Sequence, residues 1–112
     1  MDEFFTWLYG RSARNKHIRD MAQRTLKLLK SQQSVEHMEL CKSLGIGLDQ
    51  YKKPKRTFYS VMNPMVKVRL IQKKRLYNKG NNKSYKTHYM ITPSKFSGYM
   101  SRVIEEIHSN IK

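Results

Sequence analysis

Apolar residues recur at three- and four-residue spacing in the first half of the chain and predict two helices there. In the first helix, over residues 17–31, the basic residues lie mostly off an apolar stripe that consists of Ile18, Met21, Ala22, Thr25, Leu26 and Leu29. After a short extended piece, Ser34 is placed to cap a second helix over residues 35–45. The buried side of this helix is marked by Val35, Met38, Cys41, Leu44 and Ile46. Gly45 or Gly47 is expected to end it.

A third helix is predicted from Pro54, because proline suits the first turn of a helix. Its core side repeats at helical spacing and consists of Phe58, Val61, Met62 and Met65. Pro64 falls inside this pattern, and its ring would clash with the carbonyl of Ser60. We therefore expect a kink or a local break near Met62 and Asn63.

From Val68 the residue pattern changes to one that is typical of strands. The runs 68–78 and 84–92 flank the turn-forming segment "KGNNK", and together they predict a β-hairpin with a basic tip. One face of the second run carries Tyr85, Thr87, Tyr89 and Ile91. Thr92 and Pro93 then suit the cap and the first position of a last helix over residues 93–111.

Apolar residues also gather at the two ends of the chain. Residues 1–13 are predicted to form an aromatic helix or arm that docks either on the chain's own core or on a second subunit. The last helix either closes its own core or supplies a helix–helix seam. We favour a homodimer formed by the terminal segments. Its predicted interface consists of Phe4, Phe5, Trp7, Leu8, Phe96, Met100, Val103, Ile107 and Ile111.

Charge layout adds a second constraint to this pattern. The 112 residues, enough for one domain, carry a formal net charge of +15. No Asp or Glu occurs between Gln50 and Ile104, a stretch with fourteen Lys or Arg. A field of one sign costs stability through self-repulsion and indicates a polyanionic partner, above all nucleic acid. A merely solubilising surface usually mixes signs, and a membrane surface would favour a basic amphipathic helix or a lipidation signal, neither of which is evident.

Other classes of site lack their sequence signatures. Cys41 is the only cysteine, so we expect no intrachain disulfide and no Cys-based zinc site, but a small buried side chain in a reducing compartment. The four histidines lack metal-ligand spacing, and paired carboxylates, a Gly-rich phosphate loop and a nucleophile motif are missing. No metal, no cofactor and no enzymatic activity are therefore expected. Neither a signal peptide nor a membrane-length segment is evident, so a cytoplasmic protein is expected.

The order of predicted elements and two local motifs resemble the winged helix-turn-helix family. In "FYSVMNPMVKVRLIQKK" an apolar helical repeat runs into Leu70 and Ile71, which open the hairpin. Arg69 stands where many members of the family have Gly. In "THYMITPSKF" the junction from Tyr89 to Pro93 is similar to the family's common exit from the wing.

This resemblance covers residues 15 to about 93, and the loop between the second and third helices is longer than usual in the family. It implies an α+β, mainly helical fold with a three-helix core and a β-hairpin wing. We expect a single domain over residues 1–112, with the core over 14–92 and a C-terminal helix over 93–112 that serves dimerisation.

The resemblance also implies that the third helix enters the DNA major groove while the hairpin contacts the adjacent backbone or minor groove. The residues agree, because the outward side of this helix carries donors for bases and phosphates and no acid. The helix set consists of Lys55, Arg56, Tyr59, Ser60, Asn63 and Lys67. Phosphate contacts are predicted before the helix and on the hairpin, at Lys52, Lys53, Lys73, Lys74, Arg75, Lys79, Asn81, Asn82 and Lys83. The alternatives are a solvated helix face and a charged hairpin that protects its own edge.

These observations give one main functional hypothesis and two alternatives. The main one is sequence-specific binding of double-stranded DNA by a homodimeric transcriptional regulator, which predicts a palindromic site. One alternative is a replication or architectural DNA-binding protein of a plasmid or virus. The other is a winged helix that binds RNA or protein.

Overall fold

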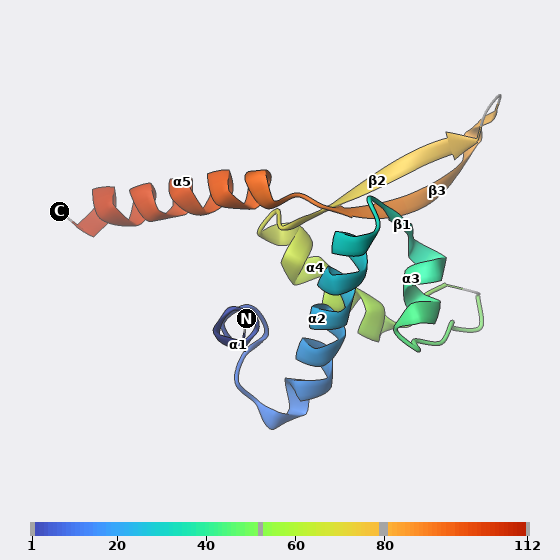
Figure 1. Cartoon of the computed structure of the whole chain (residues 1–112), viewed down its shortest axis with the longest axis horizontal. Helices are drawn as coiled ribbons and strands as arrows, with labels where there is room; N and C mark the ends of the chain where they lie inside the picture. Colours follow the sequence, from blue (N-terminus) through green and yellow to red (C-terminus); the bar gives the residue numbers. More distant parts are fainter. Residues whose placement is uncertain (1, 52, 79–80, 112) are drawn as a thin grey trace.

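Helices and one small antiparallel sheet form an α+β, mostly helical protein in the computed structural model, which describes residues 2–51, 53–78 and 81–111 (Figure 1). The elements are α1 (Asp2–Tyr9), the short 3-10 helix η1 (Ala13–Asn15), α2 (Lys16–Ser31), β1 (Val35–Glu36), α3 (His37–Ser43), α4 (Arg56–Lys67), β2 (Ile71–Asn78), β3 (Asn81–Ile91) and α5 (Pro93–Ile111). The strand order in the sheet is β1-β3-β2.

The predicted first helix is confirmed as α2, and its apolar stripe faces the core. Its buried residues are Ile18, Ala22, Thr25, Leu26 and Leu29. The hydroxyl of Thr25 donates to the carbonyl oxygen of Met21 at 2.8 Å. A buried polar side chain is tolerated in the core when its hydrogen bond is made in this way.

The second predicted helix starts later than its sequence pattern suggested. Residues 35 and 36 form the short strand β1, which pairs with β3 through Val35 and Tyr89. Glu36, not Ser34, caps α3, because its carboxylate accepts from the backbone N–H of Glu39 at 3.2 Å. The predicted stop is confirmed at Gly45, where the chain turns with φ of +70°.

The third helix is confirmed as α4, but it does not start at Pro54 and has no break at Pro64. The helix begins at Arg56 with Lys55 as its N-cap, so Pro54 lies before it and instead forms a bridge with Leu48. The helix also continues through Pro64 without a break. Met62 and Met65, on either side of Pro64, are both fully buried. Their packing stabilises the helix where proline removes one backbone hydrogen bond.

The C-terminus of α4 has a Schellman motif with an arginine in the position that usually takes glycine. The N–H of Leu70 donates to the carbonyl of Met65, and that of Arg69 donates to Val66, both at 3.0 Å. Arg69 has a φ of +65°, the only positive value at a described residue other than glycine. A left-handed backbone costs a residue with a Cβ about 1 kcal/mol.

The predicted hairpin is confirmed, and a third strand joins it. Within the hairpin Ile71 pairs with Ile91 and Tyr77 with Tyr85. Tyr89 is 2% exposed and meets Phe58 of α4 edge to face, with 5.8 Å between ring centroids. Through this contact the sheet packs on α4, and the alternating pattern seen in the sequence fixes which face of β3 does so.

The terminal helices differ in how they meet the core. Phe5 of α1 is 2% exposed, and the hydroxyl of Tyr9 donates to the carbonyl of Val61, so α1 docks on its own chain. α5 has no buried residue, and Figure 1 shows that it starts at the base of the hairpin and that its C-terminal part extends away from the other helices. It begins at Pro93 as predicted, but the hydroxyl of Thr92 donates to the carbonyl of Arg69 at 2.9 Å.

Candidate nucleic-acid interface

The outer face of α4 lines an open depression of about 610 Å³. Four of the predicted base- and phosphate-binding residues, which we call the α4 outer face, lie together there, namely Arg56, Tyr59, Ser60 and Asn63. They are one, three and four positions apart, so they share one side of the helix, while the core stripe occupies the other. Arg56, Ser60 and Asn63 are exposed and Tyr59 is half-buried.

The opposite wall of this depression comes from residues that the sequence analysis did not assign to a nucleic-acid interface. Arg14 and Asn15 of η1 and His17 of α2 line it, together with Leu8 and Tyr9 of α1. Asn15 donates from Nδ2 to the carbonyl of Tyr9 at 2.9 Å, which ties η1 to the end of α1. The basic stretch 11–16 was the only signal in the sequence, and it carries no periodicity that would orient its side chains.

Charge in the depression has a single sign. Its lining includes Arg14, Arg56 and the titratable His17, but no Asp or Glu. Burial raises the pKa of the Tyr9 hydroxyl above its ordinary value, so this group remains a neutral donor to Val61. A groove lined by one sign of charge concentrates counter-ions of the other sign.

The remaining predicted residues around α4 lie outside the depression. Lys55 caps the helix at its start and donates from its backbone N–H to the carbonyl of Gly47 at 3.2 Å. Lys67 is exposed in the last turn. Lys53 is exposed in a loop that is held by Asp49, whose carboxylate accepts from the Lys53 N–H at 3.0 Å. Lys52 lies outside the described residues.

The predicted hairpin cations divide between the two faces of the sheet. Lys73 pairs with Tyr89, Lys74 with His88 and Arg75 with Thr87. Because successive side chains alternate across a strand, Lys73 and Arg75 share one face while Lys74 lies on the other. Lys79 lies outside the described residues, as do the side chains of Asn81, Asn82 and Lys83.

An exposed aromatic group accompanies Arg75 on the hairpin and was missed by the sequence analysis. The Arg75 Cζ atom lies 4.7 Å from the centroid of the Tyr85 ring. Tyr77 meets Tyr85 at 5.6 Å between centroids, and these rings are 54% and 44% exposed. A guanidinium stacked on an aromatic face is held in place by a cation–π contact. Only the cross-strand register, which the sequence does not give, brings the two tyrosines together.

The terminal residues predicted to form a dimer interface divide into buried and exposed members. Phe5 is buried in its own core, so it has no surface to offer a partner and we withdraw it from that set. Phe4 packs edge to face on Phe96 at 5.7 Å, which joins α1 to α5 within one chain. Trp7, Ile107 and Ile111 are 56%, 50% and 77% exposed. Leu8, Met100 and Val103 are half-buried.

The overall fold is similar to that of a solved structure. That structure is a possible transcriptional regulator from Methanosarcina mazei, with a TM-score of 0.54, and the match covers 98% of this chain and 81% of that chain. The sequence identity is 13%, so the likeness concerns the fold alone. No protein-family model and no curated protein matches the sequence.

The described parts of the chain carry neither a cluster of metal-ligating side chains nor a membrane-length apolar helix. No group of three or more His, Cys, Asp or Glu side chains is placed there to hold a metal ion. None of the helices there is both long and apolar enough to cross a membrane.

Proposed function

We propose that this protein binds double-stranded DNA as a transcriptional regulator of the winged helix-turn-helix type. The observation that carries the proposal is the α4 outer face, where an arginine, a tyrosine, a serine and an asparagine lie together in a depression without acids. Arginine can donate two hydrogen bonds to guanine, and asparagine can pair with adenine in the same bidentate way. Serine and tyrosine hydroxyls suit phosphate oxygens.

The order of elements supports the same proposal. Three helices, α2, α3 and α4, precede the hairpin, and the short strand β1 pairs with it. In helix-turn-helix proteins the N-terminal residues of the recognition helix contact base edges. Arg56, Tyr59, Ser60 and Asn63 belong to the first eight residues of α4. The fold of the possible regulator from Methanosarcina mazei adds an independent argument.

Phosphate contacts in this proposal come from residues around α4 and along the hairpin. Lys53, Lys55 and Lys67 are exposed near the two ends of α4, and Lys73, Lys74 and Arg75 are exposed on β2. Lysine neutralises phosphate without reading sequence. The contribution of these residues is therefore affinity, and that of the α4 outer face is specificity.

The proposed assembly is a homodimer through α5. This helix of 19 residues leaves Ile104, Ile107 and Ile111 at least half exposed, although the apolar stripe of a helix normally packs against another element. A two-fold pair of these helices would cover them and would present two α4 outer faces to one duplex. The DNA site is then a palindrome with half-sites about one or two helical turns apart.

Binding of a single strand, including RNA, is a second candidate that one observation favours. Tyr77 and Tyr85 are exposed on a basic hairpin beside Arg75. Exposed aromatic rings in a basic setting stack on unpaired bases.

Fluorescence anisotropy with a labelled random-sequence duplex, a DNA strand of the same length and an RNA hairpin separates these candidates. The titrations are made at about 50 and 200 mM salt, because phosphate contacts weaken linearly in log salt. We expect the duplex to bind most tightly at both salt concentrations. Tighter binding of the single DNA strand or of the RNA hairpin at the higher salt concentration would favour the second candidate.

A further inference from the structure

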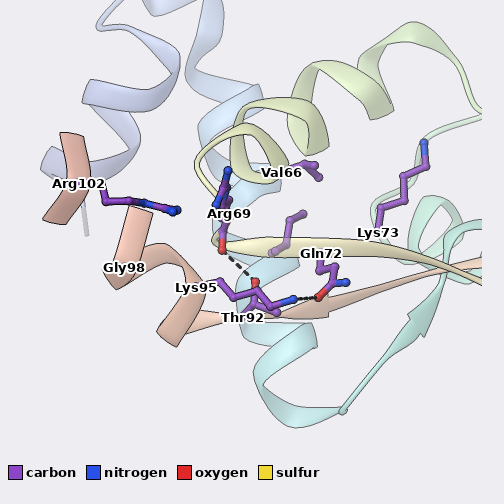
Figure 2. Close-up of a pocket in the computed structure, with 9 residues that line it drawn as sticks. Val66, Arg69, Gln72, Lys73, Thr92, Lys95, Gly98 and Arg102 are labelled. Atoms are coloured by element: carbon purple, nitrogen blue, oxygen red, sulfur yellow. Dashed lines mark hydrogen bonds between the residues drawn. The ribbon is translucent and has the colours of Figure 1, made fainter. Parts of the chain in front are cut away.

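A basic cleft lies where the C-terminus of α4, the start of β2 and the first half of α5 meet (Figure 2). Its volume is about 770 Å³. The charged residues that line it are Arg69, Lys73, Lys95 and Arg102, and the apolar ones include Val66 and Ile71. None of its lining residues is an acid. A cleft of this size is in the range of small-molecule sites.

The four cations come from two segments, one at the start of the hairpin and one after it, and among the described residues none of them has an anionic partner within a salt-bridge distance. The salt bridge found among the described residues joins His37 and Glu36, which lie elsewhere. Like charges gathered in one cleft repel one another unless an anion joins them. A group of this composition is complementary to a multiply charged anion.

Several contacts hold the cleft in shape without neutralising it. The hydroxyl of Thr92 donates to the carbonyl of Arg69 at 2.9 Å, and Lys95 Nζ donates to Gln72 Oε1 at 2.7 Å. The guanidinium of Arg69 lies 5.4 Å from the centroid of the Tyr99 ring. Figure 2 shows Arg102 extending from α5 towards Arg69, while Lys73 stands apart at the rim. Two guanidinium groups are therefore directed into one end of the cleft.

At Arg69 a substitution can remove ligand binding without unfolding the protein. Its left-handed backbone is relaxed in glycine and strained in arginine, and its side chain is exposed. The cation–π contact with Tyr99 is at an exposed site, where such contacts are weak. The fold alone therefore favours glycine at this position, and an arginine here supplies charge at a cost in stability.

We propose that this cleft is a binding site for the phosphate groups of an anionic ligand. Guanidinium groups match phosphate oxygens in a bidentate way, and lysine adds point charge. The site is separate from the α4 outer face, because Arg69 follows the last turn of α4 and Arg56 begins its first turn. The cleft can bind phosphate groups whether or not the α4 outer face binds DNA.

Such phosphate groups have two sources, a free phosphorylated small molecule and the backbone of a nucleic acid. The test uses inorganic tripolyphosphate as the free probe and a labelled duplex as the other. The cleft variant is Arg69→Gly with Arg102→Gln. The matched control is Lys27→Gln with Lys30→Gln, which removes the same charge from exposed positions on α2.

Calorimetric titration at low salt is expected to show that tripolyphosphate binds the cleft variant at least about ten times more weakly than the wild type. The affinity of the control for tripolyphosphate is expected to stay within about two-fold of the wild-type affinity, because salt screens charges that lie far from the cleft. Amide shifts from the probe should gather at residues 66–73 and 92–102. Equal weakening in both variants, or shifts spread over the whole basic surface, would overturn the proposal.

The thermal midpoint gives a readout that is independent of any ligand. Arg69→Gly alone should raise it by roughly 4 °C, because glycine relieves the left-handed strain. A fall of several degrees would show that Arg69 is structural and would remove the argument for its role. The variants remain folded in the expected outcome, so lost binding cannot be ascribed to unfolding.

The duplex titration then identifies the source of the phosphate. If the cleft variant loses both tripolyphosphate and duplex affinity relative to the control, the site takes backbone phosphates. If only tripolyphosphate affinity falls, the ligand is a free phosphorylated molecule. Both outcomes support the phosphate site in the cleft. If the wild type binds no duplex at all, the proposed DNA binding is contradicted, but the phosphate site is not.

Discussion

Cys41 illustrates at the residue scale how burial changes the chemistry of one side chain. The thiol is 1% exposed, and burial together with the nearby charge of Glu36 raises its pKa to about 11. An exposed thiol ionises near pH 9. At pH values between the two, the unfolded chain has lost the proton that the folded chain still holds.

The free energy of unfolding should therefore fall as the pH rises from about 9 towards 11, and the stabilising contribution should be fully present below pH 9. Urea titrations of the wild type and of Cys41→Ala at several pH values measure this effect. The variant loses packing to the same extent at every pH. Because it lacks the thiol, only the wild type is destabilised by thiol ionisation as the pH rises, so the difference in stability between the two proteins should become smaller. A gap that stays constant would show that the thiol does not ionise differently in the two states.

Glycine and proline in the sequence predicted helix ends and breaks correctly only where the surrounding packing allowed them. Gly45 or Gly47 was predicted to end the second helix, and Gly45 does so with positive φ. Pro64 was predicted to kink or break its helix, but α4 continues through it because residues on both sides are buried. The residue type at position 69 did not predict its left-handed backbone, because arginine is not a residue that this conformation favours.

At the scale of elements, α1 docks on the body through several side chains, of which Phe5 is the one that is buried in the core. Phe5 lies in the core at 2% exposure, and Phe4 reaches α5 through Phe96. The substitution Phe5→Ala should lower the free energy of unfolding by about 3 kcal/mol, because it removes a buried ring and leaves a cavity. Urea denaturation measures this change, and amide exchange over residues 3–9 should become faster.

The matched control is Trp7→Ala on the same helix. Trp7 is 56% exposed, so its loss from a monomer should change stability by no more than about 0.5 kcal/mol. Equal effects of the two substitutions would show that α1 docks differently from the arrangement described here.

Element types and faces followed from periodicity, whereas the contacts between elements did not. The stripes on α2 and α4 fixed their buried sides, so the α4 outer face was available from the sequence. Strand β1 has two residues, too few for any period, and exists because β3 pairs with it. The basic cleft joins Arg69 to Arg102 across a hairpin, and no local pattern brings them together.

At the scale of the whole molecule, α5 projects from the body (Figure 1). Its side chains Ile104, Ile107 and Ile111 are exposed. The proposed homodimer would cover them. Sedimentation equilibrium at about 100 µM should give a dimer for the wild type, because a standard interface binds well below that concentration. Ile107→Lys should give a monomer, since it places a charge in the proposed seam.

Ser109→Lys is the charge-matched control. Ser109 is exposed on α5 and lies two positions from Ile107, on the other side of the helix. This variant should remain dimeric. A wild type that sediments only as a monomer at this concentration would contradict the proposed assembly.

The central claim is that the α4 outer face recognises duplex DNA. The test uses a double variant of the α4 outer face, Arg56→Ala combined with Asn63→Ala. The control is a second double variant with the same residue types, Arg11→Ala combined with Asn110→Ala, at two exposed positions outside the depression. A duplex selected from a random pool by the wild type and a scrambled duplex supply the two affinities to be compared. We predict that the ratio of these affinities falls at least about ten-fold in the α4 variant and is unchanged in the control. An unchanged ratio in the α4 variant would contradict the account.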